Sequence, residues 1–367
     1  MIPIFEPVFE GAERDYLMSC IDTGWISSQG AYIEKFEAAF AEYCGMPMGV
    51  SASSCTTALH LALVALDIGP GDEVLCPDLT FIAPANMIAL TGARPVLVDV
   101  EPDTWAIDPA GMTEKISDKT KAAIIVHPFG HLADMDPIME ICNRRGISVI
   151  EDVAEAPGAF YKNRMAGTFG ALSCFSFFAN KIMTTGEGGM VLTRDADLDK
   201  RLRTFRDHGM SRERRYHHIV AGYNYRMTNM QAAVGLGQLE RLDATLEHRA
   251  LQDAQYRQRL TNGGLAYRPV RADCRSVHWL ATVTLDDAAD RDPLLAYLKD
   301  NGVDGRQMVF PVHEAIPYAD ANDPAAFPVA TAVSHRSLHL PSGTGLSAED
   351  VGRVCDLVID WVAERRR

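Results

Sequence analysis

The sequence lacks the features that mark several large classes of protein. Its eight cysteines are scattered singly, with no CxxC pair and no cysteine–histidine cluster at zinc spacing. A disulfide scaffold and a zinc-binding fold are therefore not indicated, and we expect a reduced, cytoplasmic protein. No apolar run reaches the roughly 20 residues that span a bilayer. The first ten residues include acids, so we expect neither a signal peptide nor a membrane partner.

Positive charge is also scarce. Lys and Arg number 35 against 49 Asp and Glu, which gives a formal net charge of −14. Broad binding of nucleic acid is not expected because no general basic field is available, although a local pocket for a phosphorylated small molecule is compatible with this balance. The chain has no Walker lysine, no GxGxxG after its first strand and no GxSxG elbow. Nucleotide triphosphatase, NAD-dependent and serine hydrolase functions are therefore disfavoured.

What the chain does have is a large supply of core residues. Apolar residues make up 47% of 367 positions, which is enough for one large domain and a smaller one. From about residue 50, short β-rich runs alternate with helical stretches, a pattern that predicts βαβ units and a mostly parallel sheet in an α/β fold. We predict a buried helix over 56–66 and strands over 73–77, 94–100, 122–129 and 147–153.

The pattern changes after about residue 240. Helical periodicity is predicted over 242–260, 293–302 and 347–366, with a strand-like run over 277–285. We expect an N-terminal arm over 1–15, a large domain over 16–242 and a small C-terminal α+β domain over 243–367.

One lysine stands in an unusual setting. In FFANKIMTTGEGGMV (177–191), Lys181 lies between an aromatic apolar run and a glycine-rich turn. Mostly uncharged neighbours suit a lysine that forms an imine, because only the deprotonated amine is nucleophilic. The commoner role of such a lysine is a solvated charge at the end of a strand. GEGG (186–189) predicts a tight turn between two strands, since no helical pattern follows it.

A carboxylate precedes this lysine by 29 residues. Asp152 ends the apolar run of ISVIEDVAEAPGA (147–159). A carboxylate there suits a protonated pyridine nitrogen, the pairing that makes pyridoxal phosphate an electron sink. Alternatively, Asp152 caps the following helix or binds a metal with Glu151 and Glu155. The polar loop HPFGHLADMD (127–136) also leaves a metal site as an alternative, but we expect no metal, because the predicted chemistry needs none.

A hydroxyl-rich turn opens the predicted helix at 56–66. In VSASSCTTALHLAL (50–63), the free N–H groups and the dipole of the helix start favour a phosphate. Ordinary N-capping by the same hydroxyl groups is the alternative reading of this turn.

Together these motifs resemble the DegT-like family of nucleotide-sugar aminotransferases, which depend on pyridoxal 5'-phosphate. The resemblance implies the type I aminotransferase fold, in which a mostly parallel mixed sheet is flanked by helices and followed by a smaller C-terminal domain. It covers nearly the whole chain, through motifs that include SSCTTALHLALVALDIGPGDEV, DLTFIAPANMI, VIEDVAEAPGA, FSFFANKIMTTGEGGMV and GYNYRMTNMQAAVGLGQLERL.

The resemblance implies a role for each matching residue. Lys181 would bind the cofactor covalently and move protons, and Asp152 would partner its pyridine nitrogen. Glu155 falls near the phenolic oxygen, where the family often has Gln, and Phe81 would stack on the pyridine ring. The phosphate would be held by Ser54, Cys55, Thr56 and Ser176, with Asn224 reaching it from the neighbouring subunit of a homodimer.

One position departs from the family pattern, and the substrate positions are less defined. Many relatives have Gly at the place of Cys55, where a Cβ would crowd the phosphate unless φ is negative. For substrate contacts we expect Trp25, Ser27, Arg226 and His313. The alternatives are an ion pair near the dimer interface for Arg226, a core position for Trp25 and a turn cap for His313.

The resemblance also implies the reaction. It points to transfer of an amino group from L-glutamate to a nucleotide-linked keto-deoxysugar, with C4 of GDP-4-keto-6-deoxymannose as the expected acceptor, in the synthesis of a surface polysaccharide such as a lipopolysaccharide O-antigen. Two alternatives remain open: a UDP- or dTDP-linked 3- or 4-keto sugar as acceptor, or a PLP-binding regulatory protein that has kept the fold without turnover.

Overall fold

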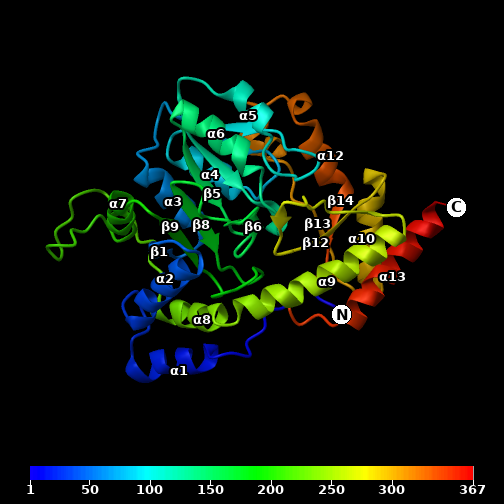
Figure 1. Ribbon diagram of the computed structural model, residues 1–367, viewed down its shortest axis with the longest axis horizontal. Helices are drawn as coiled ribbons and strands as arrows, with labels where there is room; N and C mark the ends of the chain where they lie inside the picture. The colour runs from blue at the N-terminus through cyan, green and yellow to red at the C-terminus, as the bar shows by residue number, and fades with distance from the viewer. Residues whose placement is uncertain (367) are drawn as a thin grey trace.

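The main sheet has seven strands in the order β1-β9-β8-β5-β4-β2-β3. The structure is a computed structural model that describes residues 1–366 (Figure 1). Strands β3, β2, β4, β5 and β8 pair in parallel, whereas β9 runs antiparallel to both β8 and β1. The predicted mostly parallel sheet is therefore confirmed. The strands are β1 (Met48–Ala52), β2 (Glu73–Pro77), β3 (Arg94–Val98), β4 (Thr120–Val126), β5 (Ser148–Asp152), β8 (Leu172–Ser176) and β9 (Gly189–Thr193).

Helices flank this sheet, as the resemblance implied (Figure 1). The helix predicted over 56–66 is α3, and every residue of β2, β8 and β9 is buried, as expected for strands covered on both faces. The helices of this region are α1 (Glu13–Thr23), α2 (Ala31–Tyr43), α3 (Cys55–Ala65), α4 (Ala83–Leu90), α5 (Pro109–Lys115), α6 (Met135–Arg145), α7 (Ala196–Arg206) and α8 (Asn229–Leu239).

A long helix, α9 (Leu242–Asn262), leads from the end of α8 to a second, four-stranded sheet (Figure 1). That sheet has the order β10-β12-β14-β13 and packs with α9, α10 and α13 around a separate hydrophobic cluster. The elements are β10 (Ala266–Tyr267), β12 (Ala281–Thr284), α10 (Arg291–Asp300), β13 (Arg306–Gln307), α11 (Ile316–Ala319), α12 (Pro328–Arg336), β14 (Ser337–Leu340) and α13 (Ala348–Arg365). The helices predicted over 242–260, 293–302 and 347–366 are confirmed.

Two features join the regions. A small sheet pairs β11 (Cys274–Arg275) with β6 (Phe160–Tyr161), which also pairs with β7 (Arg164–Met165). In addition, Val277 and Trp279 pack in the core of the main sheet. The strand-like run predicted over 277–285 forms a strand only from Ala281, because its first residues bond to a loop of the large region instead. The exact division at residue 242 stays a prediction.

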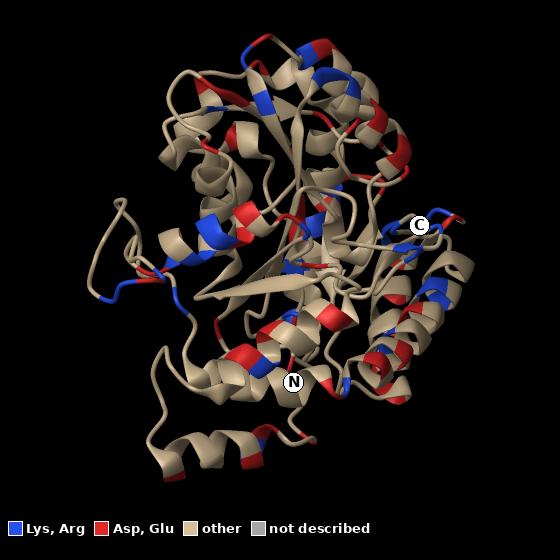
Figure 2. Cartoon of the chain, turned by 60° about the vertical axis from the view of Figure 1, so that its left-hand side comes forward, with Lys and Arg blue, Asp and Glu red and all other residues tan. Residues whose placement is uncertain are grey.

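Charged residues lie mainly on helices and loops, with both signs interspersed (Figure 2). At the start of α13, Ser347 accepts a hydrogen bond from the N–H of Asp350 while its own N–H donates to the Asp350 carboxylate. This reciprocal cap fixes where the last helix begins. Within residues 1–366, no helix is both long enough and apolar enough to cross a membrane.

Candidate active site

Lys181 lies in the loop that connects β8 to β9. Its N–H donates to the carbonyl oxygen of Phe178 at 2.9 Å. The loop is closed below it by two further backbone bonds, from Phe177 to Gly188 and from Thr185 to Phe177, both at 2.9 Å. The two strands are joined by a loop over 177–188 rather than by the predicted tight turn, because Gly189 already belongs to β9 and the chain only bends at Gly186 and Glu187.

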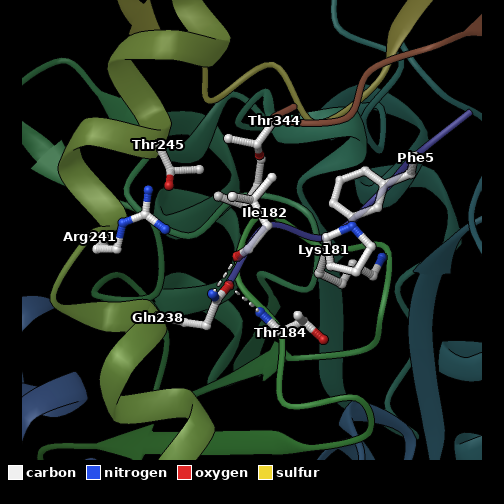
Figure 3. Close-up of a pocket in the computed structure, with 10 residues that line it drawn as sticks. Phe5, Lys181, Ile182, Thr184, Gln238, Arg241, Thr245 and Thr344 are labelled. Carbon is white, nitrogen blue, oxygen red and sulfur yellow. Dashed lines mark hydrogen bonds between the residues drawn. The ribbon is translucent and has the colours of Figure 1, made fainter. Parts of the chain in front are cut away.

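The N-terminal arm and α8 support the loop from another side (Figure 3). The side chain of Gln238 on α8 accepts from the N–H of Thr184 at 3.4 Å and donates to the carbonyl oxygen of Val8 at 2.9 Å. One glutamine thus links the arm, α8 and the lysine loop. A small pocket opens here, and its lining includes Phe5, Lys181, Ile182, Arg241 and Thr344 (Figure 3).

Gly189, the first residue of β9, lies close to the start of α3. A Cβ on Gly189 would lie 2.5 Å from the carbonyl carbon and oxygen of Ser54, a distance that side chains do not adopt. Strand β9 therefore passes directly against the start of α3 because position 189 has no side chain. Glycine is required at position 186 for a different reason: its φ of +82° lies in the left-handed region, which favours glycine.

The start of α3 offers unpaired backbone donors. Ser54 caps the helix, accepting from the N–H of Thr57 at 3.2 Å, and its own N–H donates to the Thr57 hydroxyl at 3.1 Å. The N–H groups of Cys55 and Thr56 meet no acceptor within residues 1–366. Two free N–H groups at the positive end of a helix dipole suit a phosphate.

The side chain of Cys55 faces Asp152. Its Sγ lies 4.0 Å from Oδ1 of Asp152, and burial raises the pKa of the thiol well above its usual range. Cys55 is the first residue of a right-handed helix, so its φ is negative and the Cβ is accommodated without strain. The departure from glycine at this position therefore leaves the phosphate site open.

Asp152 ends β5 in a buried setting. It is 6% exposed, and Oδ1 accepts from the N–H of Ala154 at 3.0 Å. Burial raises the pKa of Asp152 to about 6, and the nearby carboxylate of Glu155 acts in the same direction. A cationic N–H donor beside Asp152 would offset the cost of burying its charge.

The amine of Lys181 has two close neighbours. Its Nζ lies 3.5 Å from Oε1 of Glu155 and 3.8 Å from the ring centroid of Trp279. The other carboxylate oxygen of Glu155 accepts from the N–H of Phe129 at 2.7 Å. The lysine side chain is 12% exposed, so the amine sits in a largely enclosed place rather than in open solvent. The solvated strand-end charge that the sequence left open does not describe it.

Ser176 and Phe81 complete the surroundings at the same edge of the sheet. Ser176 ends β8, is 7% exposed and accepts weakly from the N–H of Phe178 at 3.4 Å. Phe81 follows β2 and leaves 63% of its surface exposed, which is unusual for a phenylalanine beside a buried strand. A free aromatic face, helix-end N–H groups, a buried carboxylate and an enclosed amine together fit pyridoxal phosphate.

The glutamate before Asp152 has a structural task. Glu151 is fully buried and accepts from the N–H groups of Gly167 at 2.8 Å and Gly170 at 2.7 Å. It also lies 3.1 Å from Nε2 of His127. These bonds fix the backbone beyond β7 and occupy both oxygens of the carboxylate.

Asn224 and Arg226 lie apart from this cluster. Asn224 is exposed, and its Oδ1 accepts from Nε of Arg226 at 2.9 Å. Arg226 also pairs with Asp207 at 3.1 Å. Neither has a hydrogen bond to the lysine cluster within the described part of the chain. The contact of Asn224 with a neighbouring subunit stays a prediction.

The segment that contains the predicted substrate residues Trp25 and Ser27 is exposed, and its backbone is hydrogen-bonded to Asn229. Trp25 is 55% exposed, so the alternative that it belongs to the core is wrong. The side chain of Asn229 donates to the carbonyl oxygen of Trp25 at 2.7 Å, and the N–H of Asn229 donates to that of Ser27 at 2.6 Å. These bonds fix the backbone of the segment and leave its side chains facing outward.

His313 is enclosed. It is 2% exposed, its Nδ1 lies 2.7 Å from Oδ2 of Asp78, and its N–H donates to Oδ1 of the same residue at 2.8 Å. Its ring stacks on Phe327 with centroids 4.8 Å apart. This pair ties residue 313 to the end of β2. A contact of His313 with substrate stays a prediction.

Sequence reasoning missed Trp279 and Phe129. Trp279 was visible only as one aromatic residue within a strand-like run, and Phe129 as the end of a predicted strand. Contacts between such distant segments leave no periodic signal in a single sequence.

The chain is similar to known proteins in sequence and in structure. Residues 8–359 match the DegT/DnrJ/EryC1/StrS aminotransferase family. The chain is 46% identical to the GDP-perosamine synthase of Caulobacter vibrioides, with 96% of each chain covered. It is 40% identical to the GDP-perosamine synthase of Escherichia coli O157:H7, with 99% of each covered. Among solved structures, the aminotransferase TlmJ from Streptoalloteichus hindustanus superposes with a TM-score of 0.94 at 33% identity and full coverage of both chains.

Proposed function

Since the chain belongs to the DegT/DnrJ/EryC1/StrS aminotransferase family, we propose that it aminates C4 of GDP-4-keto-6-deoxymannose with L-glutamate, giving GDP-perosamine. It is a PLP-dependent sugar aminotransferase. The observation that carries the choice of acceptor is that both relatives described above are GDP-perosamine synthases matching nearly the whole chain. A PLP-binding regulatory role is not favoured by these relatives.

The residues divide the work of holding the cofactor. The free N–H groups of Cys55 and Thr56 would bind its phosphate, with the hydroxyl of Ser176 adding a donor. Asp152 would keep a proton on the ring nitrogen, and Phe81 would cover one face of the ring. When bound, pyridoxal phosphate supplies an electron sink for the carbon that loses its proton.

Lys181 carries the proton transfers. Its Nζ would take the α-proton of glutamate in the first half of the cycle and, in the second half, return a proton to C4 of the sugar. The carboxylate of Glu155, 3.5 Å away, is placed to stabilise the amine when it holds that proton. This role needs a fixed, partially enclosed amine, and the 12% exposure of the Lys181 side chain supports the proposal.

The substrate side of the proposal rests on two exposed residues, Trp25 and Ser27, and on the half-buried Arg226. Trp25, Ser27 and Arg226 present polar and aromatic groups to solvent or to a second subunit, and we propose that they contact the nucleotide sugar. We also propose a homodimer in which Asn224 of one subunit reaches the cofactor phosphate of the other. Action in the cytoplasm is part of the proposal, in line with eight free cysteines.

The test is a panel of acceptors. Purified enzyme with pyridoxal phosphate and L-glutamate is offered GDP-, UDP- and dTDP-linked 4-keto and 3-keto sugars, and release of 2-oxoglutarate is followed by a coupled assay. We expect turnover with GDP-4-keto-6-deoxymannose at a kcat/KM at least about tenfold above the others. Amination of a 3-keto sugar alone would refute the perosamine assignment.

A further inference from the structure

Trp279 touches both the amine and the backbone of the reactive loop. The Nζ of Lys181 lies over its ring, 3.8 Å from the centroid. The indole N–H of the same side chain donates to the carbonyl oxygen of Asn180 at 2.6 Å. A single tryptophan from the chain beyond α9 therefore contacts the tip of the lysine side chain and the peptide just before it.

Trp279 is itself held rigidly. It is 7% exposed, its N–H donates to the carbonyl oxygen of Phe129 at 3.2 Å, and the two rings lie parallel to within 3°. Its carbonyl oxygen accepts from the buried guanidinium of Arg249 on α9. The contacts fix the indole between α9 and the loop that follows β4, so the ring is a firm surface for the lysine.

Successive contacts link Trp279 through Phe129 and Glu155 back to Lys181. Phe129 accepts from the N–H of Trp279 and donates its own N–H to Glu155, whose other oxygen lies 3.5 Å from Nζ of Lys181. Gly130 allows this approach, because a Cβ there would lie 2.9 Å from the N atom of His278. The ring face of Trp279 and the carboxylate of Glu155 therefore contact the amine of Lys181 from two sides.

We propose that Trp279 is a positioning residue that fixes the amine of Lys181 for attachment of the cofactor and for proton transfer. A lysine side chain has four rotatable bonds, and its tip is otherwise free to take many positions. The indole restricts those positions, and its N–H bond holds the loop that carries the lysine. This inference rests on the proposed role of Lys181 as the reacting lysine.

The proposal predicts that loss of the Trp279 ring changes reaction rates at the amine but not the affinity for the cofactor. Within residues 1–366, no hydrogen bond or ring contact joins Trp279 to the helix end at Cys55 and Thr56, so we expect binding of the cofactor phosphate not to depend on it. Misplacement of a reacting group by about 1 Å can cost on the order of 100-fold in rate. Removal of the ring should therefore slow steps at the amine and leave affinities nearly unchanged.

The test compares Trp279→Leu and Trp279→Phe in the full chain. Absorbance after mixing cofactor-free protein with pyridoxal phosphate gives the rate of covalent attachment. Affinity for pyridoxamine phosphate, which forms no bond to lysine, reports whether the pocket is intact. Trp361→Leu is the matched control, because Trp361 also packs against a cation, Arg365, but lies in α13.

We expect Trp279→Leu to slow attachment, and kcat of the glutamate half-reaction, by about 10- to 100-fold. KM for glutamate and affinity for pyridoxamine phosphate should change less than about threefold. Trp279→Phe, which keeps a ring face and loses the N–H, should fall between, and Trp361→Leu should match the wild type. Attachment by Trp279→Leu at the wild-type rate, or an equal loss of pyridoxamine phosphate affinity, would overturn the proposal.

A separate variant, Lys181→Ala, distinguishes two outcomes: that Trp279 has no positioning role, and that Lys181 is not the reacting lysine. Lys181→Ala should form no covalent adduct that borohydride can trap. If Lys181→Ala still formed one, the lysine assignment itself would be wrong and the positioning role of Trp279 would fall with it. If Lys181→Ala formed none while Trp279→Leu behaved as wild type, only the positioning role would be refuted.

Discussion

The Sγ of Cys55 lies 4.0 Å from Oδ1 of Asp152. The first residue of α3 and the last residue of β5 therefore meet, and the helix end that suits a phosphate is fixed relative to the carboxylate that suits a ring nitrogen. The N–H groups of Cys55 and Thr56 remain free because residues in the first turn of a helix have no intrahelical carbonyl to bond.

The first prediction concerns Cys55→Gly. The substitution restores the residue common in the family and removes a buried side chain that does not contact the phosphate site. We expect cofactor affinity and kcat to stay within about threefold of wild type, while the free energy of unfolding falls by about 1 to 2 kcal/mol. Denaturant unfolding and cofactor titration measure the two effects. A tenfold gain in affinity would show that the thiol crowds the phosphate after all.

The second prediction concerns the pH dependence of stability without the cofactor. The pKa of Asp152 is raised to about 6 in the folded protein, above its unfolded value. The folded state therefore binds the proton more tightly, so this group favours folding at pH below about 4 and loses that contribution as pH rises through 6. The difference amounts to about 2 to 3 kcal/mol.

Asp152→Asn isolates that group. The variant cannot ionise, so urea unfolding of the cofactor-free variant relative to wild type should show a stability gain that appears between pH 4 and 7. The same variant should lose about 1000-fold in kcat, since a neutral amide cannot hold the ring nitrogen protonated. A difference in unfolding free energy that is flat across this pH range contradicts the buried, proton-binding carboxylate.

The third prediction compares two glycines, Gly189 and Gly186. Gly189→Ala would push a Cβ into the backbone of Ser54, so the helix start must move. We expect it to weaken cofactor binding by at least about 30-fold and to destabilise the fold by about 1 to 3 kcal/mol. Gly186→Ala is the control: nothing lies within 4 Å of its added Cβ, and only its φ of +82° is strained. It should cost about 1 kcal/mol and leave cofactor affinity unchanged. Equal losses of affinity in both variants would exclude a specific role for the β9–α3 contact.

The fourth prediction tests whether Asn224 of one subunit completes the active site of the other. Lys181→Ala and Asn224→Ala chains, each nearly inactive alone, are unfolded, mixed and refolded together. If Asn224 serves the site of the other subunit, half of the dimers are mixed and each has one intact site. Activity should then return to about a quarter of wild type. An absence of recovery in a mixture that forms heterodimers would place Asn224 outside the partner's site.

The sequence was informative where a pattern is local. Strands β2 and β5, the helix start at Ser54 and helix α13 follow from apolar runs, helical periodicity and capping residues close together in the chain. The run from Val277 was predicted as strand from its apolar composition. It is not strand before Ala281, because bonds to Phe129 and Gly130 replace the ladder.

The long-range parts of the site could not be predicted in this way. Trp279 meets the lysine loop across 99 residues, and His313 meets Asp78 across 235 residues. Such pairs depend on how the second region docks, and a single sequence carries no record of that geometry. The resemblance to a family supplied roles for the matching positions, but it could not supply Trp279, whose importance comes from its place in the structure.

The amino nitrogen can be followed from donor to product with an isotope label. Enzyme loaded with pyridoxal phosphate is given ¹⁵N-labelled L-glutamate and GDP-4-keto-6-deoxymannose, and the products are analysed by mass spectrometry, with Lys181→Ala as the control. We expect a GDP-linked amino sugar that carries the ¹⁵N label, formed by the wild type and not by the variant. Label that stays in glutamate with the wild-type enzyme, or that enters the sugar equally with Lys181→Ala, would contradict the proposed function.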